Sequence, residues 1–278
     1  FIPISLDPAK FALRWQKKLC TVGLNPVTAA GGQVFVSQIG YHKDQVLYAL
    51  ESKSGDIFWS KDFGDINSVN PPSYYDGNVY VQTGNHGDDT YLRAYDAQTG
   101  DLVFRSSHRA QWDRYYAPTI YKGTVYINGG YYGGMYAFDG KSGQQEWFND
   151  LEQYDEWTPA VDEKWAYAFM AGKMYVVDRL TGKTAFTISA PDFDSGWVGY
   201  TPVLGRLSDA FVIEDGRLIH FNLDTRTLGW VNSANFSGQP TVVNEVVYAI
   251  NSGVLGAYDQ RTGALVWMWE VPGGGILQ

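Results

Sequence analysis

The residues best suited to chemistry lie in loop-like stretches that are rich in aromatic and arginine side chains. Aromatic rings and arginines are frequent anchors of protein partners, and flat aromatic faces also suit sugars. The expected binding residues are Trp112, Arg114, Tyr115, Tyr116, Tyr131, Tyr132, Trp157, Trp197 and Tyr200. The alternative for each of these rings is packing between neighbouring elements of the fold.

Candidate metal ligands are weaker than the aromatic set. His42, His86 and His108 suggest a zinc site, and Asp192 with Asp194 suggests calcium. Surface histidines and solvated carboxylates are the simpler interpretation, so we predict no metal site. His220 replaces a small residue of a repeated motif and is expected to be packed and hydrogen-bonded.

Sequence signatures of catalysis are missing. The chain has no Gly-x-Ser-x-Gly nucleophile motif and no Gly-x-x-x-x-Gly-Lys-Ser/Thr phosphate loop. Paired loop carboxylates, such as Asp155 with Glu156, leave a glycosidase as a minor alternative. We therefore predict no catalytic residue.

Charge and cysteine content narrow the partners and the compartment. The net charge is −9, which disfavours nucleic acid as a partner. Cys20 is the single cysteine, which excludes an intrachain disulfide and fits a periplasmic, cell-surface or secreted protein. No apolar run approaches the length of a membrane-spanning helix. Because the chain begins with Phe1, we expect a processed or trimmed chain from which any signal peptide has been removed.

A motif recurs six times, near residues 51–59, 96–104, 139–147, 178–186, 222–230 and 259–267. It consists of an acidic residue, a Ser or Thr, a glycine and an aromatic residue. Its best-matching members are Gly55, Trp59, Asp96, Gly100, Asp139, Gly143, Trp147, Asp178, Gly182, Trp230, Asp259, Gly263 and Trp267. The glycine-equivalent positions are 37 to 45 residues apart. This period, with short aromatic and β-branched strands, is typical of propeller blades.

The residues of the motif have a physical role in a tight turn. The carboxylate can accept backbone N–H bonds, and glycine adopts a positive φ without steric cost. The aromatic residue begins the next strand and can cover the joint between blades. Arg226 stands at the glycine position of the fifth copy, where a positive φ would cost about 1 kcal/mol. A different turn is expected there.

Each repeat also supplies a strand that begins near a proline, namely Pro26, Pro72, Pro118, Pro159, Pro202 and Pro240. A repeat thus contains four antiparallel strands, A to D, of which C and D flank the motif. We predict an all-β propeller that forms one domain over residues 1–278. Six repeats are clear. Residues 11–19, with Trp15, look like a further D strand without a turn motif before it.

The number of blades stays open at this point. We expect a seventh blade shared between the two ends of the chain, with the 272–278 tail beginning its A strand. The alternatives are six blades with an extra strand, or a fragment of an eight-bladed protein. In every case the D→A and B→C connections share one side of a blade, here called the loop side. The A→B and C→D connections share the other, here called the turn side. Sequence variation gathers on the loop side, where we expect binding.

The Ala-x-Asp-x-x-Thr-Gly-x-x-x-Trp pattern, best seen at 94–104, 137–147 and 257–267, resembles the tryptophan-docking repeat of pyrroloquinoline quinone (PQQ)-type propellers. The resemblance covers about residues 20–270. That superfamily contains quinoprotein dehydrogenases and non-enzymatic scaffolds, such as the periplasmic lipoprotein of the outer-membrane assembly machine. The dehydrogenases are typically longer, and many hold a disulfide of adjacent cysteines against the cofactor, which Cys20 alone cannot supply. The chain is therefore closer to the scaffold type.

The resemblance and the missing signatures together imply a non-catalytic scaffold that recognises a protein or peptide on the loop side. A carbohydrate-binding module and a PQQ- or calcium-dependent oxidoreductase remain alternatives. No cofactor is expected for the scaffold, and PQQ or calcium belongs to the last alternative.

Overall fold

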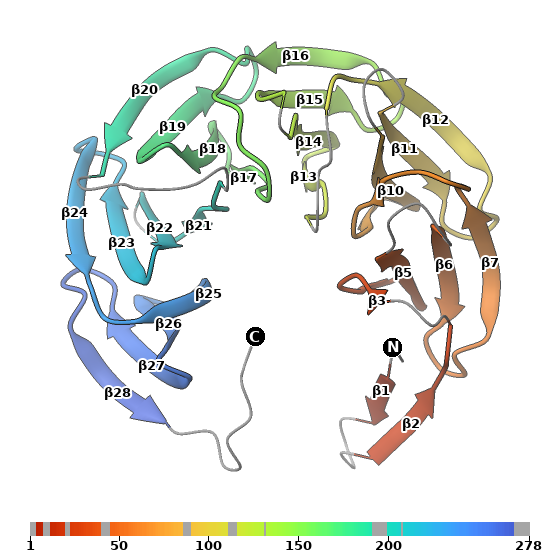
Figure 1. The fold of residues 1–278 in the computed structure, drawn as a ribbon, viewed down its shortest axis with the longest axis horizontal. Coiled ribbons are helices and arrows are strands. Elements are labelled where there is room, and N and C mark those ends of the chain that lie inside the picture. The colour runs from red at the N-terminus through yellow and green to blue at the C-terminus, as the bar shows by residue number, and fades with distance from the viewer. Residues whose placement is uncertain are drawn as a thin grey trace. The chain divides into compact units, whose positions relative to one another are not determined.

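The protein is built from small antiparallel β-sheets, each formed by consecutive segments of the chain (Figure 1). A computed structural model describes residues 4–7, 12–19, 23–39, 45–85, 90–110, 116–130, 132–190, 199–206 and 208–269. The chain divides into two compact units, Phe1–Thr158 and Pro159–Gln278, and each is treated by itself. Over the described ranges we find no helix that is long and apolar enough to cross a membrane.

In the described part of the first unit, one two-stranded sheet precedes three larger sheets. β3 and β4 both pair with β5, which continues to β6 and β7, and β8 and β9 both pair with β10, which continues to β11 and β12. The third sheet has the order β13-β14-β15-β16. The strands are β1 (Ile4–Asp7), β2 (Ala12–Gln16), β3 (Gly23–Leu24), β4 (Thr28–Ala30), β5 (Gln33–Ile39), β6 (Val46–Glu51), β7 (Ile57–Asp62), β8 (Ser68–Val69), β9 (Ser73–Tyr75), β10 (Asn78–Gly84), β11 (Tyr91–Asp96), β12 (Leu102–Ser107), β13 (Thr119–Tyr121), β14 (Thr124–Asn128), β15 (Met135–Asp139) and β16 (Gln145–Asn149).

The described part of the second unit contains three four-stranded sheets, each in chain order. Their strands are β17 (Ala160–Val161), β18 (Trp165–Met170), β19 (Lys173–Asp178), β20 (Thr184–Ser189), β21 (Val203–Leu204), β22 (Asp209–Glu214), β23 (Arg217–Asn222), β24 (Thr227–Asn232), β25 (Phe236–Val243), β26 (Val246–Asn251), β27 (Val254–Asp259) and β28 (Leu265–Trp269). The A-B-C-D order predicted for each repeat is confirmed, and with it the β-propeller class. The blade count and the single-domain assignment stay predictions.

Prolines mark the beginning of the A strands, as predicted. Pro72, Pro118, Pro159 and Pro202 each stand directly before the first residue of β9, β13, β17 and β21. At this place a strand needs no ladder N–H. Pro240 differs because it lies inside β25, where the pairing with β26 is irregular between Ser237 and Thr241.

The C→D turns fold through the predicted side-chain bonds. Asp139 Oδ1 accepts the backbone N–H groups of Lys141 and Ser142 at 3.1 and 2.7 Å. The N–H of Gly143 donates to the carbonyl oxygen of Asp139 at 2.8 Å, and Gly143 has φ of 73°. Hydrogen bonds from the side chain and backbone of Ser142 hold the pKa of the Asp139 carboxyl below its ordinary value. The turns at Asp96, Asp178 and Asp259 have the same design.

The aromatic residue of the motif docks on the turn of the following sheet. Trp59 Nε1 donates to the carbonyl oxygen of Ala97 at 2.9 Å. A Cβ atom added to Gly100 would lie 2.8 Å from the Trp59 ring, closer than packed atoms approach. In the second unit Trp230 lies against Gly263 in the same manner. The glycine therefore serves both the positive φ and the close approach of the ring.

The turn at the fifth motif corrects one expectation. Arg226 adopts the left-handed conformation, with φ of 57°, instead of avoiding it. Its guanidinium lies 4.5 Å from the centre of the Phe186 ring, so the side chain stacks on the aromatic residue that would otherwise meet a glycine. Asn222 Oδ1 still accepts the N–H of Thr225 at 2.8 Å. The turn differs in that β23 and β24 pair as far as Asn222 and Thr227, one pair closer to the turn than in the other motif hairpins.

The β1–β2 hairpin corrects the expectation of an isolated D strand at Trp15. β2 pairs with β1, and the register shifts between Ser5 and Leu6, the place where every motif hairpin has its bulge. Asp7 precedes Trp15 by eight residues, as Asp139 precedes Trp147. β1 and β2 are thus a C–D hairpin, and the eight-residue spacing was the signal in the sequence.

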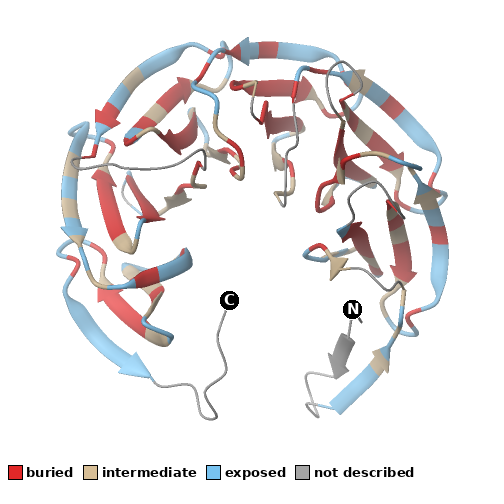
Figure 2. Ribbon diagram, in the orientation of Figure 1, coloured by how far each residue is buried: buried red, intermediate tan, exposed pale blue. Residues whose placement is uncertain are grey.

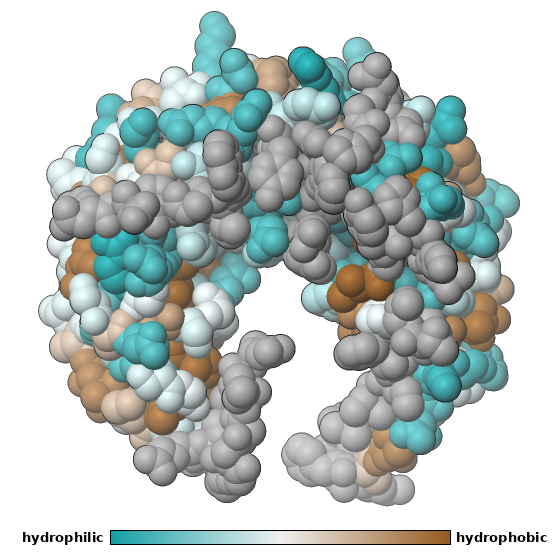
Figure 3. Space-filling model, in the orientation of Figure 1, coloured by the Kyte–Doolittle hydropathy of each residue, from teal (hydrophilic) through white to brown (hydrophobic). Residues whose placement is uncertain are grey.

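Burial is greatest in the B and C strands, and it falls in the D strands (Figure 2). Within each unit, the seams between neighbouring sheets are apolar, as where Phe35 and Leu47 meet Val79 and Val81. β28 differs from the D strands at these seams because all five of its residues, Leu265 to Trp269, are exposed. Figure 3 shows the resulting hydrophobic surface over this last sheet, at the lower left.

Candidate functional site

Four of the nine predicted binding residues fall within the described part of the chain. They are Tyr116, Tyr132, Trp157 and Tyr200, of which Tyr116, Tyr132 and Tyr200 are half-buried. The others, Trp112, Arg114, Tyr115, Tyr131 and Trp197, lie outside the described residues, as do the metal candidates His42, His86, Asp192 and Asp194.

Trp157 is a correction to the expected binding set. Its side chain is 1% exposed, so it cannot serve as an anchor on the surface. Its Nε1 donates to the carbonyl oxygen of Tyr154 at 3.0 Å, and its own carbonyl oxygen accepts a bond from the side chain of Asn128. Trp157 therefore fastens the segment after β16 to β14.

Tyr200 also serves the packing of a seam. Its N–H donates to the carbonyl oxygen of Phe169 at 2.9 Å, and the two rings are 6.3 Å apart. Burial raises the pKa of its hydroxyl. The fold thus covers part of the Tyr200 side chain, which leaves a smaller face for a partner than the sequence suggests.

Tyr132 is the predicted residue that best fits a binding site. It lies in the B→C connection between β14 and β15, and the exposed guanidinium of Arg109 lies 4.9 Å from the centre of its ring. Arg109 belongs to the D→A connection after β12, so the pair joins two loop-side segments. The Tyr136 hydroxyl donates to the carbonyl oxygen of Arg109 at 3.1 Å, which holds the arginine backbone in place. Arg109 was missing from the predicted set, although it stood beside predicted residues.

The loop side differs between the two units. In the second unit the B→C connections are two-residue turns, Ala171-Gly172, Asp215-Gly216 and Ser252-Gly253, all with positive φ. In the first unit the B→C connections run through residues 40–45, 85–90 and 129–134. The longer connections, and with them the Arg109–Tyr132 pair, thus belong to the first unit.

His108 does not fit the weak zinc hypothesis. It is 7% exposed, and its Nε2 lies 2.9 Å from Gln82 Nε2, so the ring nitrogen accepts the amide N–H. Burial lowers the pKa of His108 to about 3. The ring also packs edge-on against Tyr136 and Phe138. Among the residues that the structure describes, no three His, Cys, Asp or Glu side chains are grouped to hold a metal ion.

His220 is packed and hydrogen-bonded, as its place in the repeat predicted. Its Nε2 lies 2.8 Å from Asp209 Oδ1, and its ring stacks on Phe211 at 5.0 Å. Gln260 donates to the other oxygen of Asp209 at 2.5 Å. Gly229 leaves room for the imidazole, since a Cβ atom there would lie 2.1 Å from its Nδ1. His220, Asp209 and Gln260 thus form a buried polar cluster between the β21–β24 and β25–β28 sheets.

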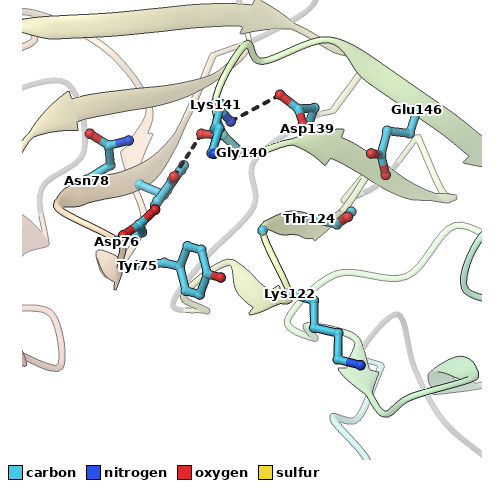
Figure 4. A pocket seen from close by; sticks show the side chains of 11 residues that line it. Tyr75, Asp76, Asn78, Lys122, Thr124, Asp139, Gly140, Lys141 and Glu146 are labelled. Carbon is cyan, nitrogen blue, oxygen red and sulfur yellow. Dashed lines mark hydrogen bonds between the residues drawn. The ribbon is translucent and has the colours of Figure 1, made fainter.

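A polar pocket of about 360 Å³ lies on the turn side of the first unit. Figure 4 shows Tyr75 from the end of β9, Asp76 from the β9–β10 turn, Thr124 from β14, and Asp139 and Glu146 from the β15–β16 hairpin around it. Lys122 and Lys141 complete a lining of both charges. The Asp139 carboxylate already accepts hydrogen bonds within its own turn, whereas the side chains of Asp76 and Glu146 are exposed to a ligand. Nothing in the sequence had pointed to a site on this side.

The four-stranded sheets and their docked tryptophans define a propeller of PQQ-type repeats. The profile of the family described as outer membrane protein assembly factor BamB matches residues 4–154 and 133–275, so the chain belongs to this family. Within the superfamily it is closer to BamB than to the dehydrogenases.

Individual relatives agree with this assignment. The outer membrane protein assembly factor BamB of Francisella tularensis subsp. tularensis is 27% identical over 127 residues, 46% of this chain and 25% of the relative's length. The crystal structure of BamB from Moraxella catarrhalis superposes with a TM-score of 0.68 at 18% identity, covering 92% of this chain and 78% of that one. A quinohemoprotein alcohol dehydrogenase from Comamonas testosteroni superposes with a TM-score of 0.72 at 15% identity, covering 96% and 63%. The structural matches show the fold.

One feature of many quinoprotein dehydrogenases, the disulfide of adjacent cysteines, cannot form in this chain. The chain has one cysteine, Cys20, and therefore lacks the adjacent cysteine pair.

Proposed function

We propose that the chain is a non-catalytic scaffold that binds another polypeptide on the loop side of the first unit, in outer membrane protein assembly. The observation that carries the proposal is the exposed Arg109 guanidinium stacked on Tyr132. An arginine held over an aromatic ring loses little freedom on binding and keeps its N–H edges for a partner's acceptors. Family membership supports a protein partner, and a role in outer membrane protein assembly supports a location in the periplasm or at the cell surface.

A photo-crosslinking amino acid at position 132 tests this proposal in cells. We expect position 132 to form a crosslink to a polypeptide that takes part in outer membrane protein assembly. Position 261 is the control, because Arg261 is 67% exposed on a C→D turn. In addition, Arg109→Ala should reduce the crosslink from position 132. Equal crosslinking at both positions, or none at position 132, would contradict the loop-side site.

A carbohydrate ligand is the second candidate, favoured by the turn-side pocket. The half-exposed ring of Tyr75 can stack on a sugar, and Asp76, Asn78 and Glu146 can bond its hydroxyls. Titration with a glycan library should give binding that Tyr75→Ala abolishes and Tyr74→Ala preserves. Binding that is unchanged in Tyr75→Ala would remove the pocket from consideration.

A further inference from the structure

Three cations and two aromatic rings gather at the seam between the β3–β7 and β8–β12 sheets. Lys61 lies in β7 and Phe63 directly follows that strand, whereas Tyr91, Arg93 and Arg105 come from β11 and β12. Phe63 packs edge-on against Tyr95 of β11, with ring centres 6.3 Å apart, so the two sheets meet at this place. The Lys61 ammonium lies 6.0 Å from the Tyr95 ring centre.

The two arginines are held by one tyrosine. The guanidinium carbons of Arg93 and Arg105 lie 5.0 and 4.6 Å from the centre of the Tyr91 ring. Arg93 is also 5.5 Å from the Phe63 ring, and its Nε donates to Thr83 Oγ1 at 3.1 Å. Stacking uses the faces of the guanidinium groups. Most of their N–H donors therefore remain at the edges, where a carboxylate can bind two at once.

The cluster has no neutralising carboxylate among the residues that the structure describes. No described ion pair involves Lys61, Arg93 or Arg105. Arg93 and Arg105 are opposite each other on paired strands, where like charges are unfavourable. The nearest acidic neighbour in the chain, Asp62, accepts the N–H of Gly64 at 2.8 Å within its own turn. A chain of net charge −9 thus concentrates cations at one seam.

We propose that this cluster binds an acidic segment of a partner polypeptide, with carboxylates on the guanidinium edges and apolar side chains on the rings of Tyr91 and Phe63. This inference rests on the proposed function in that the ligand is a polypeptide. Arg109 follows Arg105 by four residues, a span of at most about 14 Å. The cluster and the Arg109–Tyr132 pair can therefore contact one extended segment. The overall negative charge disfavours a nucleic acid or an anionic membrane as the ligand.

Fluorescence anisotropy of a labelled Glu-rich peptide, titrated with the purified chain, tests the inference. We expect binding that weakens as salt is raised, and a roughly tenfold or larger loss of affinity in Arg93→Gln and in Arg105→Gln, equivalent to about 1.4 kcal/mol. The matched control is Arg261→Gln, which removes an exposed arginine elsewhere. A peptide with every Glu replaced by Gln should not bind.

The inference is overturned if the Glu-rich peptide fails to bind, or binds Arg105→Gln as tightly as the unchanged chain. Preferential binding of phosphatidylglycerol vesicles over the peptide would overturn it as well. Arg105 is exposed, so its replacement leaves the fold intact, and a thermal melt of each variant checks this. Peptide binding without a crosslink from position 132 would contradict the proposed function and support the acidic-segment site at Arg93 and Arg105. A crosslink from position 132 without peptide binding would support the proposed function and contradict the acidic-segment site.

Discussion

Trp59 and Trp267 hold the same position in their C–D hairpins and have opposite surroundings. Trp59 is 8% exposed, lies against Gly100 and donates its indole N–H to Ala97. Trp267 is 42% exposed, and its ring centre lies 5.9 Å from that of Tyr248, a residue of its own sheet. The motif places a tryptophan at the end of the hairpin, but the turn of a neighbouring sheet is what buries it.

The last sheet of the second unit has one apolar face that is buried and one that is exposed. On one face Val247, Ala249 and Tyr258 pack against Phe211 of the preceding sheet, and Gly263 receives Trp230. On the opposite face Trp267 is exposed, and Tyr248 is half-buried although its equivalent in the first unit, Phe35, is fully buried. A blade of this type is thus apolar on two faces, and its stability depends on having a neighbour on each.

The largest effect should come from removing a docked tryptophan. Trp59→Ala should lower the free energy of unfolding by about 3–5 kcal/mol, because it empties a filled seam and leaves the Ala97 carbonyl without its donor. Trp267→Ala should cost less than about 1 kcal/mol, since its ring is largely in water already. Guanidinium denaturation of both variants measures the difference. Equal losses would mean that Trp267 is docked in solution.

Glycine substitutions separate the contact from the backbone strain. Gly100→Ala should destabilise by about 2–4 kcal/mol, because the added Cβ meets the Trp59 ring and alanine must adopt φ of 72°. Gly253→Ala is the control, with φ of 81° and nothing within 4 Å of the added atom, and should cost about 1 kcal/mol. If Gly100→Ala and Gly253→Ala lower the free energy of unfolding equally, the clash with the Trp59 ring costs nothing beyond the backbone strain.

Acidification should affect the buried seam through His108. Its pKa is about 3 in the folded chain, compared with 6.5 for an ordinary histidine, so the unfolded state takes up the proton first. Stability is therefore fully present above about pH 6.5 and falls as the pH drops towards 3, by about 2 kcal/mol at pH 5. His108→Gln should lose this share of the pH dependence in denaturation curves between pH 7.5 and 5. An unchanged pH profile would show that the imidazole is protonated or exposed in solution.

The smallest effect concerns the docking turn that lacks glycine. Arg226→Gly should leave stability nearly unchanged, because relief of the left-handed strain offsets the lost stacking on Phe186. Arg226→Ala keeps the strain and loses the stacking, so it should unfold about 1 kcal/mol more easily. Thermal melts of the two variants give the comparison. An alanine variant as stable as the unchanged chain would mean that stacking does not compensate the turn.

Local patterns predicted the sheets because their causes are local. The carboxylate of Asp139 bonds N–H groups two and three residues away, and Gly143 is four residues away. The hairpin of β1 and β2 was missed because Phe11 stands at the glycine position and no Ser or Thr precedes it. The eight-residue distance from Asp7 to Trp15 was present all the same.

The candidate site was less predictable for a related reason. Trp157 and Tyr132 look alike in the sequence, since both are aromatic residues in loop-side connections. Asn128 ties the backbone of Trp157 to β14, whereas Arg109 from another connection stacks on Tyr132. Arg93 and Arg105 were not predicted as binding residues, because they lie inside strands and are twelve residues apart. Strand pairing places them opposite each other.

The repeat, the four-stranded sheets, the docking turns and the family could all be predicted from the sequence, because each depends on residues a few positions apart. The packing of the sheets determines which tryptophans are buried, which loop aromatics remain available and where the cations gather. Trp59 meets its acceptor 38 residues further along the chain, on a different sheet. Contacts of that kind depend on how the sheets pack. Because the motif is almost the same in every sheet, it does not indicate which copies are covered by a neighbouring sheet.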